Sequence, residues 1–305
     1  MSLPRTATSS AATPGSPPAA QLGLPDDRPA AIGRFGHNRG VHSKSVGTAQ
    51  HGQLEGGIAL EQSKSLVVLP QTRRNAIFYG TAELVGLLQR SAAAVAQDRP
   101  GSMLKVGNLS RETGGDIGPS VSHNSGRDAD VLFFAVDRFG TGGEPDNFCH
   151  FNDTGIADGP ASDAGRYEFD VERNWALVRH WLTDPDVVVQ WIFVAAPLRN
   201  QLLDCALRQG EPALLRLRAA RVLVQPRDSS PHADHFHLRI GCPPGDRPEC
   251  LDGGVATAAA REAQIDALLQ MYHLGSPAEQ RYARELLSLP PGSDVAQLPP
   301  IEGVD

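Results

Sequence analysis

Histidine and aspartate recur at short spacings in two distant segments of the chain. His123 and Asp130 flank a loop that contains Gly126, and His235 and His237 form a His-x-His pair. A zinc ion that hydrolyses a bond takes three nitrogen or oxygen ligands and leaves a fourth position open. Neutral imidazoles with one carboxylate provide such a set, so metal-assisted hydrolysis is the chemistry that these residues could perform.

Each half of this pattern also has a simpler interpretation. A His-x-His pair on a strand is often a surface pair or a pair of hydrogen-bonded structural histidines, and a lone histidine and aspartate at the other spacing are a weaker signal still. The two halves together, each beside an apolar run, favour a metal site. Asp128 shares strand parity with Asp130, so it could compete as a ligand or contact a ligand from behind.

Short apolar runs must position these residues. Asp130 opens the run 131–136, which is rich in β-branched and aromatic residues and predicts a buried strand. In the run 235–240, alternate side chains share a face, so His235 and His237 point one way while Phe236 and Leu238 point the other way into a core. Gly126 has the backbone freedom that lets the loop between His123 and Asp130 fold back toward one metal.

The wider pattern predicts an α+β fold with a small, mostly antiparallel sheet that carries the site, flanked by helices. Strands are predicted at 66–69, 104–106, 131–136, 187–194, 222–224 and 235–240. Helices are predicted over 81–97, with Thr81 as the N-cap, and over 169–182, 198–207 and 211–218.

The chain divides into three parts by composition. Residues 1–40 predict a disordered tail, because their Ser, Thr, Ala and Pro content leaves too little apolar surface to offset the entropy of ordering. Residues 41–252 are predicted to form the catalytic domain, because they contain both halves of the histidine and aspartate pattern. Residues 253–305 predict a C-terminal helical hairpin and a Pro-rich tail, with one helix from Thr257 to His273 and a second that starts at Ser276 with a capping box.

Composition excludes several classes of protein. With 305 residues and 40% hydrophobic content, the chain can bury one sizeable core. A formal net charge of −7 argues against nucleic acid as a partner. No run of 18 apolar residues is present, so no transmembrane segment is expected. The first residues show neither the basic start nor the apolar stretch of a secretory signal.

The ordered motifs of residues 45–250 resemble a known family. The pattern Ser-His-x-x-Gly-x-x-x-Asp with His-x-His resembles the LAS group of zinc peptidases, and more narrowly the penicillin-insensitive murein endopeptidase family. The motifs that carry the narrower resemblance are Ser45-Val46-Gly47, Gly52-x-Leu54-x-x-Gly57, Tyr79-Gly80, Leu104-x-Val106-Gly107-Asn108-Leu109-Ser110, the segment from Ser122 to Asp130, Asn174-Trp175-Ala176-Leu177-Val178, Gln190-Trp191-Ile192-Phe193-Val194 and Asp234-His235-Phe236-His237-Leu238-Arg239.

The resemblance implies roles for individual residues. His123, Asp130 and His237 would bind one Zn²⁺ per chain, and His235 and His232 would be the catalytic histidines that flank the metal. The assignment of acid and base between these two stays open. The chain departs from the family at Asn124, where a glutamine is common, and at Ser120, where some members place one more histidine. Both departures concern hydrogen bonds on the substrate side.

The resemblance also implies a substrate and a location. The expected substrate is peptidoglycan, with cleavage of the D-alanyl-diaminopimelate or diaminopimelate-diaminopimelate amide that cross-links stem peptides. Arg127 and Arg239 are candidate clamps for the free carboxylates of these stems. The expected location is the periplasm or another exported compartment. The alternatives are a D,D-carboxypeptidase or dipeptidase of the same group, and a non-catalytic peptidoglycan-binding relative.

Four cysteines fit an exported protein. Cys242 and Cys250 enclose a turn-rich loop that a disulfide could close, and a pair at this place is a feature of the family. Cys149 and Cys205 would then form a second bridge, although four cysteines allow three connectivities and the sequence does not choose among them.

Overall fold

Six strands form the central sheet of the protein. The computed structural model describes residues 42–252 apart from 119, 141, 160–162 and 227–228, together with 271, 275–277, 279–281 and 283. From one edge to the other the strands are β11 (Leu223–Val224), β10 (Val189–Phe193), β12 (His235–Ile240), β7 (Asp128–Leu132), β6 (Leu104–Val106) and β4 (Leu66–Val68). The three inner pairs are antiparallel and the outer pairs, β10–β11 and β6–β4, are parallel.

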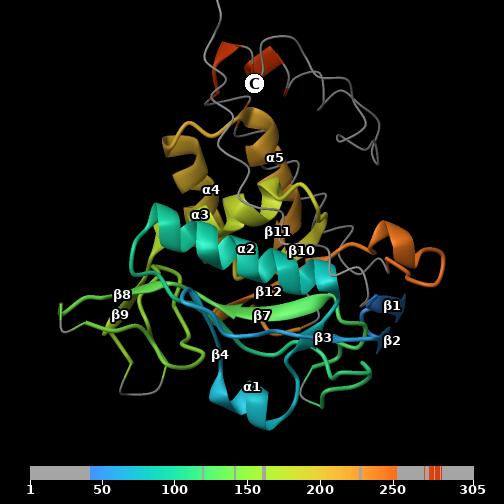
Figure 1. Cartoon of the computed structure of the whole chain (residues 1–305). Helices are drawn as coiled ribbons and strands as arrows, with labels where there is room; N and C mark the ends of the chain where they lie inside the picture. Colours follow the sequence, from blue (N-terminus) through green and yellow to red (C-terminus); the bar gives the residue numbers. More distant parts are fainter. Residues whose placement is uncertain are drawn as a thin grey trace, which may run out of the picture. The chain divides into compact units, whose positions relative to one another are not determined.

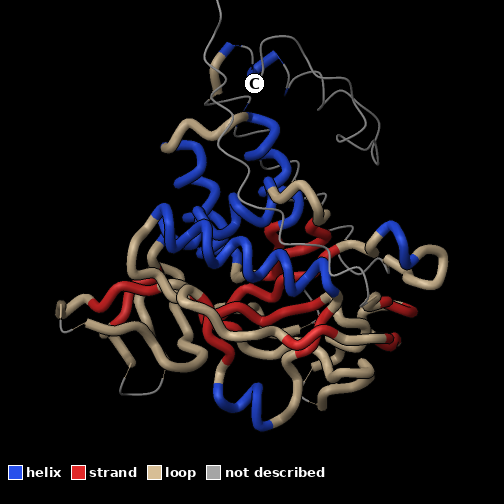
Figure 2. The backbone as a smooth tube through the Cα atoms, in the orientation of Figure 1, coloured by secondary structure: helices blue, strands red, loops and turns tan. Residues whose placement is uncertain are grey.

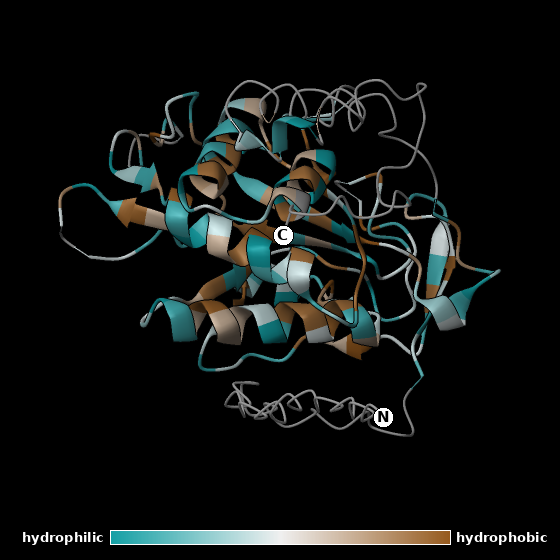
Figure 3. Ribbon diagram, turned by 90° about the horizontal axis from the view of Figure 1, so that it is seen from above, coloured by the Kyte–Doolittle hydropathy of each residue, from teal (hydrophilic) through white to brown (hydrophobic). Residues whose placement is uncertain are grey.

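Four helices lie together on one side of this sheet, and loops and short strand pairs lie on the other (Figures 1 and 2). They are α2 (Ala82–Asp98), α3 (Val171–Thr183), α4 (Ala196–Arg208) and α5 (Ala213–Val222). Apolar and hydrophilic residues alternate along them (Figure 3). On α2 the fully buried residues Leu84, Leu87 and Leu88 follow helical spacing. The Thr81 side chain accepts the backbone N–H of Leu84 and caps this helix, as predicted.

Aromatic side chains join the helices to the sheet. Trp181 of α3 is fully buried, and its ring centroid lies 5.6 Å from that of Phe236 on β12. The ring centroid of Phe133 lies 4.6 Å from that of Phe236. Phe236 lies between His235 and His237 in the sequence, so the core packing of its ring fixes the opposite face of β12 as the face that carries the histidines.

The α+β class is confirmed, and each predicted strand of the sheet is present, with one correction. The run 131–136 does not form a single strand that Asp130 opens. Strand β7 begins at Asp128, so Asp130 lies inside it, and the run breaks into a second strand, β8 (Ala135–Asp137). The cause is Asn174, whose side-chain amide bonds both the N–H and the C=O of Phe134 at 3.0 and 2.8 Å and so replaces a strand partner.

Short elements that the sequence pattern did not predict surround the sheet. They are the antiparallel pairs β1 (Lys44–Gly47) with β2 (Gly52–Glu55), β3 (Ile58–Ala59) with β5 (Tyr79–Gly80) and β8 with β9 (Tyr167–Phe169), the helix α1 (Pro70–Arg74) and the single 3₁₀ turn η1 (Pro244–Asp246). In the part of the chain that the structure describes, no helix is long and apolar enough to cross a membrane.

The predicted tail of residues 1–40 and most of the predicted C-terminal hairpin lie outside the described residues. The start of the second predicted helix is described. There the Ser276 N–H donates to the Glu279 carboxylate at 2.7 Å and the Glu279 N–H donates to the Ser276 hydroxyl at 3.4 Å. This reciprocal pair is the predicted capping box.

The segment after β12 returns to the first strand of the described chain. The Gly47 N–H donates to the Glu249 carbonyl at 2.9 Å, the Leu251 N–H donates to the Gly47 carbonyl at 2.9 Å, and the Ser45 N–H donates to the Asp246 carboxylate at 2.8 Å. A disulfide between Cys242 and Cys250 closes the loop between them, as expected. The second expected bridge is absent: Cys149 and Cys205 are free and buried. Each has its own polar neighbour, the His150 carbonyl for Cys149 and the Gln209 amide for Cys205.

Replacing both Cys242 and Cys250 with serine is expected to lower the free energy of unfolding by about 2–3 kcal/mol, because the bridge removes the closure entropy of this short loop from the unfolded chain. Urea unfolding without reducing agent measures the difference. The control is the same measurement with a reducing agent, which should destabilise the wild type and leave the stability of the variant unchanged. Equal stability of the two proteins would show that the loop is held by its hydrogen bonds alone.

Candidate active site

The pairing of β7 with β12 places the two halves of the sequence pattern side by side. In the antiparallel register, Asp130 lies directly opposite His237 and Asp128 directly opposite Arg239. His235 precedes His237 by one pleat repeat on the same face. The strand register therefore brings the carboxylate and the His-x-His pair together without a contribution from the loops.

His123 reaches the same place from the loop before β7. Its backbone takes the left-handed conformation, with φ of 73°, and Gly126 follows with φ of 72°. A Cβ at Gly126 would lie 2.7 Å from the Leu54 side chain. Glycine is thus needed there both for its conformation and for space, which agrees with the loop predicted around it. The resulting turn buries the His123 ring completely.

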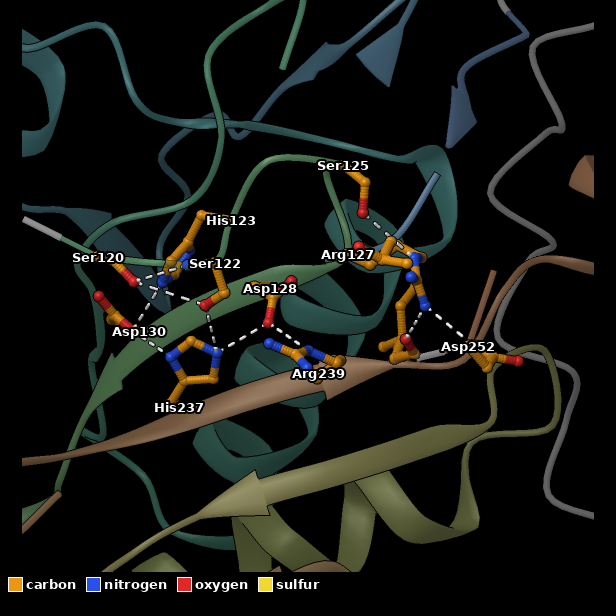
Figure 4. A network of polar contacts seen from close by, with 12 residues as sticks. Ser120, Ser122, His123, Ser125, Arg127, Asp128, Asp130, His237, Arg239 and Asp252 are labelled. Atoms are coloured by element: carbon orange, nitrogen blue, oxygen red, sulfur yellow. Dashed lines mark hydrogen bonds and ion pairs between the residues drawn. The ribbon is translucent and has the colours of Figure 1, made fainter. Parts of the chain in front are cut away.

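Three imidazole nitrogens converge on one carboxylate oxygen. The Asp130 Oδ1 atom lies 3.3 Å from His123 Nε2, 3.1 Å from His237 Nδ1 and 3.4 Å from His235 Nε2. Figure 4 shows Asp130 with His123 and His237. Among the described residues, neither ring nitrogen of His123 has a hydrogen-bond partner, and neither has Asp130 Oδ1. Buried polar atoms are rarely left in this state unless a ligand is meant to satisfy them.

The spacing of these atoms fits a metal ion. Ligands about 2.0 Å from a tetrahedral zinc ion are separated by roughly 3.3 Å. The separations from Asp130 Oδ1 to His123 Nε2 and to His237 Nδ1 match this edge length. Single donor atoms of these three buried residues also lie within 4.8 Å of one another, and the same holds for His232, His235 and His237. The chemistry of either set suits a divalent cation.

Residues at the end of β6 hold Asp130 in place. The Asn108 amide donates to Asp130 Oδ2 at 3.0 Å, and the backbones of Gly107 and Asn108 bond that of Asp130 at 2.7 and 2.8 Å. One carboxylate oxygen is therefore fixed while the other faces the imidazoles. Asn108 belongs to the motif that runs from Leu104 to Ser110, but the sequence pattern did not predict a role for it at the site. Its position directly after a strand, where polar side chains often reach a neighbouring site, was the available signal.

Asp128 lies behind His237 and does not face His123. The His237 Nε2–H donates to Asp128 Oδ1 at 2.8 Å, and the Arg239 Nε–H donates to the same oxygen at 2.6 Å. Burial by itself raises the pKa of Asp128, but Arg239 and His237 outweigh it and leave the pKa well below its ordinary value. Of the two roles left open for Asp128, the structure therefore shows contact with the candidate ligand.

Neither arginine proposed as a substrate clamp is available for that role. Arg239 is occupied by Asp128 and is buried. Arg127 is fully buried and donates to Asp252, to the Leu251 carbonyl and to the Ile240 carbonyl at 3.0–3.2 Å. The sequence did not show that both faces of the sheet are covered at these positions, and this cover is what buries the two arginines.

His235 differs from the second flanking histidine in its neighbours. His235 Nδ1 lies 2.7 Å from Asp234 Oδ1. Strand alternation would turn the Asp234 side chain away from His235, but β12 begins only at His235, so alternation does not apply to Asp234. Burial lowers the pKa of His235, yet Asp130 and Asp234 overcome this effect and raise it to about 10. The edge of the Phe148 ring lies against His235, with 5.0 Å between centroids.

His232 completes the group of histidines. Its ring centroid lies 5.0 Å from that of His235 and 5.5 Å from that of His237. Its Nδ1–H donates to the Ser230 carbonyl at 2.7 Å, which leaves Nε2 as the acceptor. Burial, assisted by the charges of His235 and His237, lowers the pKa of His232 to about 4. The two flanking histidines thus differ in charge at neutral pH.

The two departures from the family pattern lie on the loop side of the site. The Ser120 hydroxyl accepts the Ser122 N–H at 3.3 Å, and the Ser122 hydroxyl lies 3.4 Å from His237 Nε2. Asn124 donates its side-chain amide to the Gln50 carbonyl at 2.7 Å. Both residues therefore support the loop that carries His123.

Protein freed of metal by a chelator is expected to lose stability as the pH rises from about 6.5 to about 10. The folded pKa of His235 is raised from 6.5 to about 10, so its protonation stabilises the fold fully below the lower value and no longer above the upper one. Thermal unfolding across this range measures the slope. A His235→Gln variant should show a flatter profile, and an equal slope in both proteins would assign the effect to other groups.

The chain matches a known protein family over a range that includes the whole of this site. The family model of the penicillin-insensitive murein endopeptidases matches residues 45–259, which include every residue of the histidine and aspartate cluster. None of the curated proteins compared with the chain matches it.

Proposed function

Because the chain belongs to the penicillin-insensitive murein endopeptidase family, a family of peptidases, we propose that it cleaves the cross-link amides of peptidoglycan with one zinc ion per chain. The observation that supports this proposal most directly is that both ring nitrogens of the buried His123 and the Asp130 Oδ1 atom lack hydrogen-bond partners in the described structure. His123 Nε2 and His237 Nδ1 also lie at the distances from this oxygen that separate zinc ligands.

His123, Asp130 and His237 are the residues that would hold the ion. Their donor set is two neutral imidazoles and one carboxylate, and all three side chains are buried. A zinc ion bound there would polarise the scissile carbonyl and a water molecule. Asn108 and Asp128 keep the carboxylate and the His237 ring oriented while the substrate binds.

His235 and His232 divide the proton transfers. His235 lies beside the Asp234 carboxylate, which favours its charged form, so it is suited to donate a proton toward the leaving amine or the developing oxyanion. His232 presents a free lone pair on Nε2, so of the two histidines it is the one that can accept a proton from the attacking water. This assignment follows from the different partners of the two Nδ1 atoms.

The bonds that we propose for cleavage are the D-alanyl-diaminopimelate amide and the diaminopimelate-diaminopimelate amide between stem peptides. Cleavage of such links requires the protein to meet the cell wall, and we propose that it acts in the periplasm. The disulfide between Cys242 and Cys250 supports an oxidising compartment of this kind.

The experiment that tests this function combines zinc content with digestion of purified, cross-linked peptidoglycan, read by mass spectrometry of the released fragments. The expected result is one zinc per chain and conversion of cross-linked dimers to monomers. Loss of a terminal D-alanine alone would replace the endopeptidase proposal with a D,D-carboxypeptidase. Binding to the wall with neither zinc nor cleavage would identify a non-catalytic relative.

A further inference from the structure

Asp128 is a fully buried carboxylate that receives two hydrogen bonds on a single oxygen. His237 Nε2 lies 2.8 Å and Arg239 Nε 2.6 Å from Asp128 Oδ1, while Oδ2 has no partner among the described residues (Figure 4). Arginine has only donors, and it holds the carboxylate in its anionic, acceptor-only form. The hydrogen between His237 and Asp128 must therefore reside on His237 Nε2.

This hydrogen decides which lone pair His237 offers on its other side. A neutral imidazole carries one N–H, so a hydrogen fixed on Nε2 leaves Nδ1 as the acceptor. Nδ1 is the atom that lies 3.1 Å from Asp130 Oδ1 at the candidate metal site. The partner of the distant nitrogen commonly controls the tautomer and the ring angle of a histidine that binds a metal.

We propose that Asp128 and Arg239 form a positioning pair that fixes the His237 ring with the Nδ1 lone pair directed at the metal ion. The inference rests on the proposed function. The strand register supports it, because Asp128 faces Arg239 and Asp130 faces His237 in pairs of β7 and β12 that are two residues apart and share one face of the sheet. The Arg239 guanidinium also lies over the Phe193 ring, 5.8 Å from its centroid. The pair is thus built into the same two strands as the ligands.

A structural salt bridge alone would account for the contact between Arg239 and Asp128 but not for the choice of oxygen. A buried ion pair is most stable when both carboxylate oxygens are satisfied, and an arginine fork usually contacts both. Arg90 and Asp184 show that arrangement on the helical side, where Nε and one Nη reach the two oxygens at 2.8 and 2.9 Å. At Asp128, by contrast, the Arg239 Nε–H contacts Oδ1, the oxygen that already accepts from His237, and not the other oxygen.

The test compares zinc affinity in variants that keep the charge balanced. Asp128→Leu by itself would leave Arg239 buried without its partner and could prevent folding, so it is combined with Arg239→Met. Buried ion pairs replaced by apolar residues usually leave the fold intact. We expect the double variant to bind zinc about 10–100-fold more weakly than the wild type in competition with a chelator. The matched control, Asp184→Leu with Arg90→Met, should keep wild-type zinc affinity.

Two further measurements separate positioning from a general structural effect. Nitrogen-15 NMR of the zinc-bound protein should show His237 with its hydrogen on Nε2 in the wild type and a mixture of tautomers in the double variant. Asp128→Asn keeps an oxygen acceptor for His237, so it should retain most of the zinc affinity and the single tautomer if it folds.

The outcomes are distinct. A folded double variant with wild-type zinc affinity and one His237 tautomer would overturn the positioning role and leave the proposed function intact. Failure of the wild type to bind zinc would overturn the proposed function and this inference with it.

Discussion

Replacing His237 with alanine is expected to abolish zinc binding and cross-link cleavage together. The side chain supplies Nδ1 at 3.1 Å from Asp130 Oδ1, and no other described residue can take its place from the same strand position. The loss of cleavage should exceed about a thousandfold, because a metal ion contributes several kcal/mol to the transition state and each 1.4 kcal/mol is a factor of ten. Zinc content and the rate of dimer conversion on the same sample measure both effects.

His180→Ala is the matched control for this variant. His180 lies on α3 and contacts Asp98 at 2.9 Å, on the helical side of the molecule. Its removal should leave zinc content and cleavage at wild-type levels. Circular dichroism of both variants shows whether they are folded. Retention of one zinc per chain by folded His237→Ala would remove His237 from the proposed ligand set.

Replacing His235 with alanine is expected to slow cleavage by about 10²–10⁴-fold while the zinc stays bound. The reason is that general acid–base catalysis contributes factors of this size, and His235 lies beside the proposed ligands without being needed among them. The turnover number and the zinc content of the purified variant are the two measurements. The pH profile of the residual activity should lose the limb that His235 imposes in the wild type.

Asp234→Asn provides the graded comparison for His235. It removes the charge that lies 2.7 Å from His235 Nδ1 but leaves the imidazole in place, so we expect a smaller loss of turnover than in His235→Ala. Loss of zinc from His235→Ala would contradict the assignment. It would point instead to the alternative cluster of His232, His235 and His237 as the metal site.

The sequence predicted the sheet well because its strands are short apolar runs. The run 235–240 matches β12 residue for residue, and Phe236 and Leu238 are buried as expected. The break between β7 and β8 could not be predicted in this way, because it depends on Asn174, which comes from a distant helix. The hydrophobicity of the run 131–136 gives no sign that a distant side chain will take the place of a strand partner there.

The residues proposed as ligands were visible in the sequence, but their supporting contacts were not. The structure brings His123, Asp130, His235 and His237 to one point, with His232 beside them. The burial of Arg239 and its bond to Asp128 depend on the register of β7 against β12, which local patterns do not encode. The same register turned a proposed substrate clamp into an internal contact.

The hydrogen bonds between the segment after β12 and strand β1 have a consequence for how this catalytic unit can be attached to other structures. Residues 45–47 and 246–251 meet edge to edge, so the two ends of the stretch that carries the candidate site lie at one place. A domain whose ends converge can be inserted into a host protein, or circularly permuted, without crossing its own surface.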